Sequence, residues 1–367
     1  MKKEKMITVS DIVSHLHKIA NPSLAYDWDN VGLQIGNPEQ AVKKILLTLD
    51  VTKNAVEKAI NEKADLIISH HPIISKPIQK ITNPLYLRLI QNNISVYCAH
   101  TNLDVVKKGV NFALAEKLGL NNLEFLSTET GAKLYHVAVY VPQDSMIDVA
   151  NAVFEAGAGT IGNYTNCLND YEVSGQFKPM EGSSPILGEQ DKLEKVVERK
   201  LEFFVDSFYL QKVISIMKKV HPYETPAYAV YPQERQSENY GLGLIGNLKN
   251  KLTLRNFAEI VKKNLNASFV KLWPADKNQK SLIQKVAICG GNGSSLLSQV
   301  YGRADVFVSS GFNYHTLLDS KIPLIDAGHF YTEYPVLENL RNMLSDFDVE
   351  IMELKADEHE IRKELII

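Results

Sequence analysis

The first 127 residues alternate between two patterns of apolar and polar positions. Short apolar runs indicate buried strands, and longer segments with apolar positions three and four residues apart indicate helices. Strands that alternate with helices in this way are typical of βαβ units and a largely parallel sheet. The predicted elements are, in order, a helix at 9–20, a strand at 43–50, a helix at 54–63, a strand at 64–71, a helix at 83–93 and a strand at 94–100.

The same order of patterns returns near the C-terminus. Residues 45–71 align with 286–310, and both stretches run from strand through turn and helix to a strand that begins Ala-Asp. The strand at 94–100 then aligns with 322–329, and each ends on a histidine. We interpret this as an internal duplication. Chance similarity between two α/β halves is the alternative.

Residues 128–232 do not fit the repeat. Their pattern predicts the order βαββαβ, which is the ferredoxin-like arrangement of a self-contained domain. A loop rich in Gly, Pro and Ser at 178–190 separates the two middle strands. The predicted fold class is therefore α/β: a duplicated three-layer domain, formed by 1–127 and 233–367, interrupted by an inserted ferredoxin-like domain at 128–232.

Composition narrows the function classes. Lys and Arg number 40 against 43 Asp and Glu, a net charge of −3, which argues against a broad surface for nucleic acid or anionic membrane. No apolar stretch approaches a membrane span, and Asp11, His15 and His17 interrupt any signal-peptide core. We expect a cytoplasmic protein. Cys98 and Cys289 lie in apolar runs and are predicted to be buried, inert thiols rather than parts of a disulfide framework.

Candidate chemistry begins with two adjacent histidines. His70 and His71 end the apolar strand at 64–71, and Pro72 stops it. In α/β proteins, ligands bind at the carboxyl ends of parallel strands, so a metal site is one interpretation of these histidines. Two exposed loop histidines are the alternative, which is favoured unless further ligands lie near His70 and His71.

Two carboxylates follow histidines at a spacing of four. Asp104 follows His100, and Glu333 follows His329, so a helical turn at 329–333 would place the second pair on one face. A catalytic zinc usually has three protein ligands, whereas three imidazoles and two carboxylates suit two metals about 3.5–4 Å apart. The predicted ligands are His70, His71, Asp104, His329 and Glu333. Taken singly, each is explained as well by a cap, a core position or a solvated surface.

Other strand-end groups are candidates for supporting roles. His100 and His315 are proposed as proton-transfer or orienting groups, a role typical of histidine. The Gly-rich stretch 289–295 resembles an anion-binding turn, but it lacks the Walker lysine, so tight turn geometry is the favoured role. The stretch HPYETPAY at 221–228 holds a histidine and a carboxylate, and packing of a helix end onto a strand explains it as well.

Six stretches of the split domain form a recognisable set: WDNVGLQIG (28–36), ISHHP (68–72), AHTNLD (99–104), GLGLIGNL (241–248), CGGNGSS (289–295) and GHFYTE (328–333). Together they resemble the Nif-three-like family, whose members are often labelled GTP cyclohydrolase 1 type 2 homologues. The insertion resembles the PII-like or CutA-like domain of the longer bacterial members, with HPYETPAY as its best marker.

The resemblance implies a dinuclear metal site in a toroidal homohexamer in the cytoplasm. It gives the ligand roles to the same five residues, usually with zinc, while histidine and carboxylate ligands also suit iron, manganese or cobalt. It implies a small-molecule, nucleotide-like substrate; under the cyclohydrolase label this is GTP, attacked at C8 of the imidazole ring.

One position departs from the family pattern. Members commonly read Thr-Gly-Asp, three residues and then His, and here SSGFNYH keeps His315 but places Gly311 at the aspartate position. This leaves the five proposed ligands intact and puts a shared substrate or full activity in doubt.

The leading hypothesis is a metal-dependent hydrolase, with GTP ring opening and phosphoester hydrolysis as rival reactions. A second hypothesis is a non-catalytic, metal-binding regulatory or scaffold protein that uses the PII-like domain as a sensor. A purely structural metal is the third.

Overall fold

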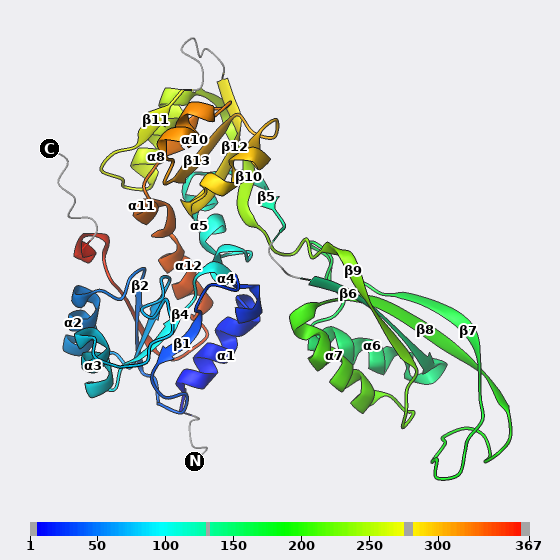
Figure 1. Ribbon diagram of the computed structural model, residues 1–367. Helices are drawn as coiled ribbons and strands as arrows, with labels where there is room; N and C mark the ends of the chain where they lie inside the picture. Colours follow the sequence, from blue (N-terminus) through cyan, green and yellow to red (C-terminus); the bar gives the residue numbers. More distant parts are fainter. Residues whose placement is uncertain (1–5, 130–132, 275–281, 361–367) are drawn as a thin grey trace. The chain divides into compact units, whose positions relative to one another are not determined.

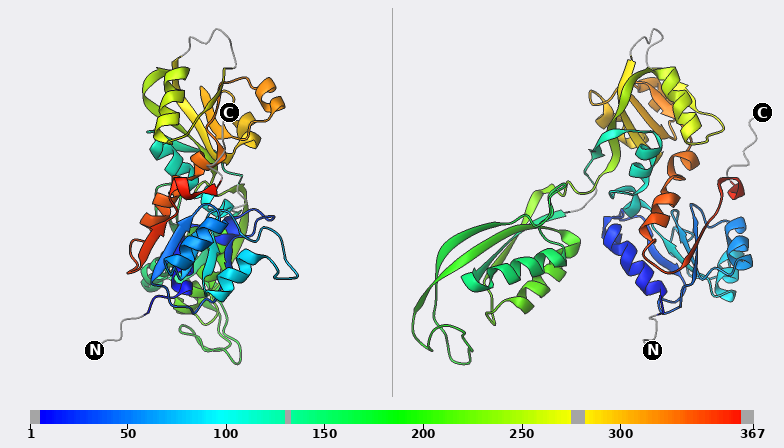
Figure 2. Two further views of the ribbon diagram at one scale, coloured as in Figure 1. Left: turned by 90° about the vertical axis from the view of Figure 1, so that its left-hand side faces the viewer. Right: turned by 180° about the vertical axis from the view of Figure 1, so that it is seen from behind.

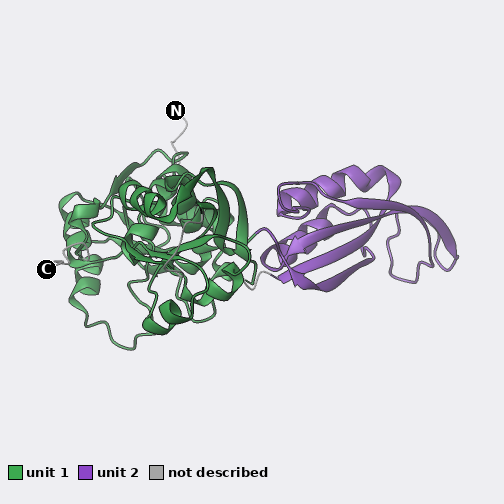
Figure 3. Cartoon of the chain, turned by 90° about the horizontal axis from the view of Figure 1, so that it is seen from above, with its two compact units in different colours: residues 1–130, 240–367 green, residues 131–239 purple. Residues whose placement is uncertain are grey.

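The computed structural model describes residues 6–129, 133–274 and 282–360. It divides into two compact units (Figure 3). Unit 1 comprises residues 1–130 and 240–367, and unit 2 comprises residues 131–239. Each unit has its own sheets and core, so each is described by itself.

The first sheet of unit 1 has five strands in the order β1-β4-β3-β2-β15. Strands β15, β2, β3 and β4 are parallel, and β1 runs antiparallel to β4. The apolar residues of β3 are buried on both faces, as expected for a central parallel strand. The elements of this half are α1 (Val9–Ile19), β1 (Gly32–Ile35), β2 (Lys44–Thr48), α2 (Lys53–Asn61), β3 (Leu66–Ser69), α3 (Pro84–Gln91), β4 (Ser95–Cys98) and β15 (Glu350–Glu353).

The second sheet of unit 1 has six strands in the order β11-β14-β13-β12-β10-β5. Strands β12, β13 and β14 are parallel, and the outer strands are antiparallel to their neighbours. The elements of this half are β5 (Asn121–Ser127), β10 (Leu242–Thr253), α8 (Leu254–Asn264), β11 (Lys271–Trp273), β12 (Leu282–Asn292), α9 (Leu297–Val300), β13 (Val306–Ser310), α10 (Tyr314–Asp319) and β14 (Leu324–Asp326).

The two sheets of unit 1 are linked by strands and helices that cross between them. Strand β15 comes from the end of the chain but completes the first sheet, and β5 comes from the first part of the chain but completes the second. Helices α5, α11 and α12 lie between the sheets (Figures 1 and 2). These connecting elements are α4 (Thr101–Asp104), α5 (Val110–Lys117), α11 (His329–Glu333) and α12 (Val336–Met343).

The cysteines of unit 1 lie where the apolar pattern predicts. Cys98 and Cys289 are free and buried, which confirms that prediction, and burial raises the pKa of both thiols. In the described part of the chain, no helix combines the length and the apolar character needed to cross a membrane.

Unit 2 has one four-stranded antiparallel sheet in the order β7-β8-β6-β9. Two helices pack on one face of it, over a core that includes Val137, Val153, Leu201 and Phe203. The elements are β6 (Lys133–Pro142), α6 (Met146–Ala156), β7 (Asn169–Phe177), β8 (Glu194–Asp206), α7 (Ser207–Val220) and β9 (Tyr228–Gln236).

Candidate metal centre

Four histidines and two carboxylates meet between the two sheets of unit 1. His70 and His71 follow β3, and His100 follows β4. The ring centroids of His70 and His71 are 4.9 Å apart, and the His100 centroid lies 5.2 Å from the first and 5.4 Å from the second. The other half contributes His329, whose ring centroid is 5.4 Å from that of His71. His71 and His329, which lie far apart in the sequence, thus share one cluster.

Glu333 lies at the middle of this cluster and is only 4% exposed. Its Oε1 is 2.9 Å from His329 Nε2 and 3.7 Å from His70 Nε2, and its Oε2 is 3.1 Å from His71 Nε2. The expected helical turn at 329–333 is present as α11, which puts His329 and Glu333 on one face.

The described residues fit a metal ion because buried donor atoms point inward without a hydrogen-bond partner. His70 Nδ1 donates to the carbonyl oxygen of Ala99 at 2.9 Å. That carbonyl can only accept, so Nδ1 carries a proton, and Nε2, which lies 3.6 Å from Asp104 Oδ1, is the atom that the neutral ring would offer to a metal. His70 Nε2 and Glu333 Oε2 are both buried and without hydrogen-bond partners. A metal ion satisfies such atoms.

The donor atoms form two overlapping groups. His70, His71 and His100 form one, and His71, His329 and Glu333 form the other; within each group the nearest donor atoms lie within 4.8 Å of one another. Asp104 adds a carboxylate beside His70. The chemistry of the set, imidazole nitrogens with carboxylate oxygens, suits zinc, iron, manganese or cobalt.

Without a metal, protonated histidines balance the carboxylates of this cluster. Burial disfavours the charged forms, but the neighbouring charges outweigh it: Asp50 and Glu333 raise the pKa of His71 to about 10, and Glu333 and Asp104 raise that of His70. Against the same cost of burial, His329 and His70 hold the pKa of Glu333 well below its usual range. Burial and the neighbouring Glu333 raise the pKa of Asp104. Metal binding must therefore displace protons from imidazoles.

Two aspartates that the sequence analysis did not single out orient the histidines. Asp50 Oδ1 accepts from His71 Nδ1 at 2.9 Å, and Asp29 Oδ1 accepts from His100 Nδ1 at 2.9 Å. Asp29 Oδ2 also accepts from the backbone N–H of Thr101 at 3.1 Å and its hydroxyl at 2.6 Å. Although burial opposes it, these hydrogen bonds lower the pKa of Asp29 to about 2. Such partners turn the free ring nitrogen toward the metal. Asp50 could have been found as the last residue of a predicted strand, beside the ends of the two strands that carry histidines.

The Gly-rich turn at 289–295 brings backbone against the cluster. Gly291 has φ +64°, and a Cβ there would lie 2.3 Å from Glu333 Oε1 and 3.2 Å from His329 Nε2. Its N–H donates to Thr332 Oγ1 at 3.0 Å, which ties the turn to α11. The structure thus supports the turn-geometry interpretation, because the glycine leaves room for the carboxylate.

His315 lies apart from these contacts. It is exposed on α10, and the only ring contact found for it in the described residues is with Tyr314. Gly311, at the position of the family aspartate, has φ +73°, and a Cβ there would lie 2.9 Å from Asn292 Cγ. An aspartate at this position would require the Asn292 side chain to move.

Replacing Asp50 by asparagine is expected to weaken metal binding by about 10–100-fold, because outer partners of metal-bound histidines contribute on that scale. The measurement is a competition titration with a chelating dye. Asp346→Asn, an exposed aspartate, is the matched control and should bind metal as the unaltered chain does. Equal affinities in Asp50→Asn and the control would show that Asp50 does not support the centre.

Metal affinity is also expected to rise with pH. In the metal-free chain the pKa of His71 is raised to about 10, so protonation of His71 stabilises the folded state. This stabilisation is complete below pH 6.5 and is lost as the pH rises toward 10. A metal competes with that proton, so the apparent dissociation constant should fall about tenfold per pH unit for each proton released. Titrations at several pH values in this window, in two buffers of different ionisation enthalpy, count the protons. Affinity that does not change with pH would contradict the predicted protonation of the cluster.

Comparison with known proteins identifies the family of this chain. The family model described as Duf34/NIF3 (NGG1p interacting factor 3) matches residues 7–360. The chain belongs to the DUF34/NIF3 family. This confirms the resemblance that the sequence stretches carry, and the match runs through both halves of unit 1 and through unit 2.

Individual DUF34/NIF3 relatives match over nearly their whole length. A Staphylococcus epidermidis protein named GTP cyclohydrolase 1 type 2 homolog is 39% identical over 346 residues, 92% of each chain. A Bacillus subtilis protein of the same name is 36% identical over 368 residues, 96% of this chain and 98% of that one. The crystal structure of a Bacillus cereus protein related to NIF3 superposes with a TM-score of 0.84 at 34% identity, covering 99% of this chain and all of the other.

Proposed function

We propose that this DUF34/NIF3 protein is a metal-dependent hydrolase that acts on a nucleotide-like small molecule at a dinuclear centre. The observation that carries the proposal is the meeting of His70, His71 and Glu333 between the sheets. Among the described residues, the buried atoms His70 Nε2 and Glu333 Oε2 make no hydrogen bond, although imidazole and carboxylate groups surround them. The relatives named GTP cyclohydrolase 1 type 2 homolog support a nucleotide as substrate.

The proposed ligands are His70, His71, Asp104, His329 and Glu333. Two divalent ions held there would act as Lewis acids and make a nucleophile from water at neutral pH. Glu333 would help to hold the ions, because its two oxygens face different histidines, and His70 and His71 would contribute imidazole ligands beside it. We propose zinc for both ions.

His100 is the better placed of the two proposed proton-transfer groups. Asp29 accepts from its Nδ1, so its Nε2 is free to hold or deliver a proton beside His70 and His71. Trp28 packs edge-on against it with ring centroids 6.1 Å apart, which restricts the ring further. His315 remains a proposal from the sequence.

An assay of a purified, metal-analysed sample with GTP and with a panel of phosphoesters tests the hydrolase proposal. The unaltered chain should turn over one of these substrates, and His71→Ala should lose the activity. His136→Ala in unit 2 is the matched control and should retain it. Equal activity in the unaltered chain and in His71→Ala would refute the proposal.

The second proposal is a non-catalytic, metal-binding regulatory protein. It draws on unit 2, which has its own core and its own cavity, and we propose that this unit is an inserted PII-like, ferredoxin-like domain. Removal of residues 128–232 should then abolish partner binding while the metal remains. Unchanged partner binding and activity after removal would contradict it.

The assembly and the origin of the fold are further parts of the proposal. The matching sequence stretches coincide with parallel strand pairs in both halves, β2 with β3 and β12 with β13, which supports duplication. Apolar side chains exposed around a groove beside α3, among them Ile78, Ile81 and Ile90, support self-association. A homohexamer is expected by light scattering, and a monomer would contradict it.

A further inference from the structure

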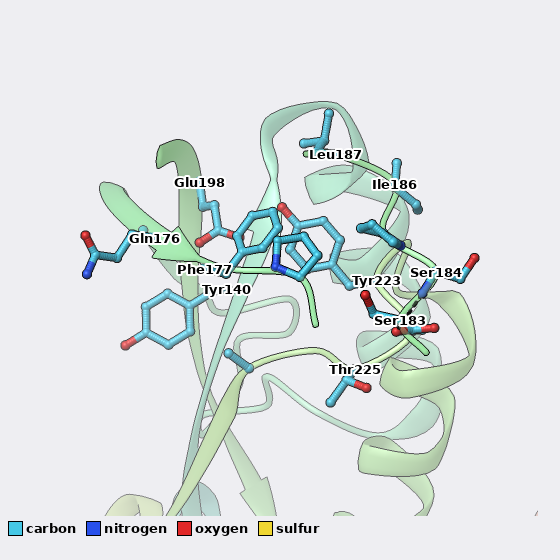
Figure 4. Close-up of a pocket in the computed structure, with 15 residues that line it drawn as sticks. Tyr140, Gln176, Phe177, Ser183, Ser184, Ile186, Leu187, Glu198, Tyr223 and Thr225 are labelled. Carbon is cyan, nitrogen blue, oxygen red and sulfur yellow. Dashed lines mark hydrogen bonds between the residues drawn. The ribbon is translucent and has the colours of Figure 1, made fainter. Parts of the chain in front are cut away.

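Unit 2 contains a cavity that the metal centre does not use. It has a volume of about 400 Å³ and opens between β7, β8, the loop that joins them and the chain after α7 (Figure 4). The loop side chains Ser183, Ser184, Ile186 and Leu187 form one wall. A cavity of this size holds a small molecule.

A buried carboxylate lies in this cavity. Glu198 on β8 is 9% exposed, and no lysine, arginine or histidine nitrogen lies within 4 Å of its oxygens in the part of the chain that the structure describes. Its side chain packs so closely against β7 that a Cβ at Gly175 would lie 2.5 Å from Glu198 Oε2. A buried carboxylate without a cation is costly to keep in a fold.

Aromatic rings surround that carboxylate. Figure 4 shows Glu198 beside the rings of Phe177 and Tyr223, whose centroids are 6.4 Å apart, with Tyr140 toward one end of the cavity. The Tyr223 hydroxyl is buried and has no partner in hydrogen-bonding geometry. Burial, with Glu198 beside it, raises the pKa of Tyr223 to about 12, so the hydroxyl keeps its proton.

The HPYE residues hold this arrangement. His221 Nε2 donates to the carbonyl oxygen of Tyr140 at 2.8 Å, and His221 Nδ1 accepts from the N–H of Tyr223 at 3.0 Å. Burial lowers the pKa of His221, which keeps it in the neutral form that these two bonds require. Glu224 Oε1 accepts from Ser184 N–H at 3.2 Å and so ties the loop wall to the same stretch. The motif therefore braces a cavity, and its histidine is a positioning residue.

The charge of the lining selects the class of ligand. The lining residues include two carboxylates, Glu198 and Glu224, and no lysine, arginine or histidine. A phosphate or nucleotide would meet only negative charge there. A single buried carboxylate offers too few oxygens for Ca²⁺ or Mg²⁺, which take six or more ligands, and the lining has no histidine or cysteine to complete a zinc site. Aromatic faces around a carboxylate are the usual surroundings of an organic ammonium group.

We propose that this cavity binds a small organic cation, with a protonated amine seated on the Glu198 carboxylate between Phe177 and Tyr223. The cavity shares no residue with the metal centre, so this ligand would belong to unit 2 itself, beyond the hydrolase proposal.

Calorimetric titration of the full chain with three probes of one shape tests this: n-butylammonium, n-butanol and butyrate, with choline and agmatine as larger cations. At least one cation should bind at millimolar concentration or below, and butanol and butyrate should not. Glu198→Gln should weaken cation binding by about tenfold or more, since hydrogen bonds to charged groups are worth that much. Tyr223→Phe keeps the ring and should weaken it several-fold.

Glu172→Gln, an exposed carboxylate on the neighbouring strand β7, is the matched control and should bind the cation unchanged. Thermal unfolding and metal content of each variant separate a failure of this proposal from misfolding and from failure of the metal centre. The proposal is overturned if butyrate or butanol binds as well as butylammonium, if no cation binds, or if folded Glu198→Gln keeps full affinity.

Discussion

Replacing Glu333 by glutamine is expected to empty the metal centre. Glutamine keeps the length and shape of the side chain but loses its negative charge. It therefore lacks the two anionic oxygens that Glu333 places beside His71 and His329. Loss of an outer partner already weakens metal binding 10–100-fold, so loss of this carboxylate should weaken it by more than about 100-fold. Metal analysis after dialysis against a weak chelator measures the effect, and hydrolysis should fall with the metal.

The control for this change is Glu338→Gln on α12. Glu338 is an exposed carboxylate whose partner is Lys117 at 2.8 Å, and surface ion pairs of this kind contribute about 1 kcal/mol or less. Its metal content should equal that of the unaltered chain. Retention of the full metal content in Glu333→Gln would show that the carboxylate is not a ligand.

Replacing Gly291 by alanine is expected to damage the centre from the backbone side. The new Cβ would lie 2.3 Å from Glu333 Oε1, and the φ of +64° adds strain of about 1–2 kcal/mol for any residue with a Cβ. Since Gly291 N–H also holds Thr332, neither the turn nor α11 can move freely. We expect metal affinity to fall by tenfold or more and the unfolding temperature to drop.

Gly302→Ala separates the two causes. Gly302 has φ +73°, but a Cβ there would meet no atom within 4 Å. It should therefore show the backbone strain alone and keep its metal. If Gly291→Ala and Gly302→Ala lose the same stability and both retain metal, the close approach of the turn to Glu333 has no role in the centre.

The helices and parallel strands of the two repeated stretches, and the histidines and carboxylates of the cluster, followed from local pattern. His70 and His71 could be placed because Pro72 ends a strand that is apolar on both faces, and the helical turn at 329–333 followed from the spacing of His329 and Glu333. These are properties of a few consecutive residues, which a sequence displays directly.

Long-range pairing could not be read in the same way. Asp50 accepts a hydrogen bond from His71 because of the order of the strands in the sheet. Asp29 accepts one from His100 because its loop crosses to the end of another strand. The swap of β5 and β15 between the sheets carries no local signal either. The cavity around Glu198 could not be predicted, because Glu198 lies in a strand whose charged residues indicate an exposed surface. The loop and the HPYE stretch, which are distant in sequence, bury it.

The most direct test of the metal centre is a crystal structure of the protein with anomalous scattering recorded at the edges of zinc, iron, manganese and cobalt. The account predicts two peaks between the sheets of unit 1, about 3.5–4 Å apart, held by His70, His71, Asp104, His329 and Glu333. No anomalous peak at these side chains in metal-supplied crystals, or a single ion that leaves Glu333 or His71 uncoordinated, would contradict it.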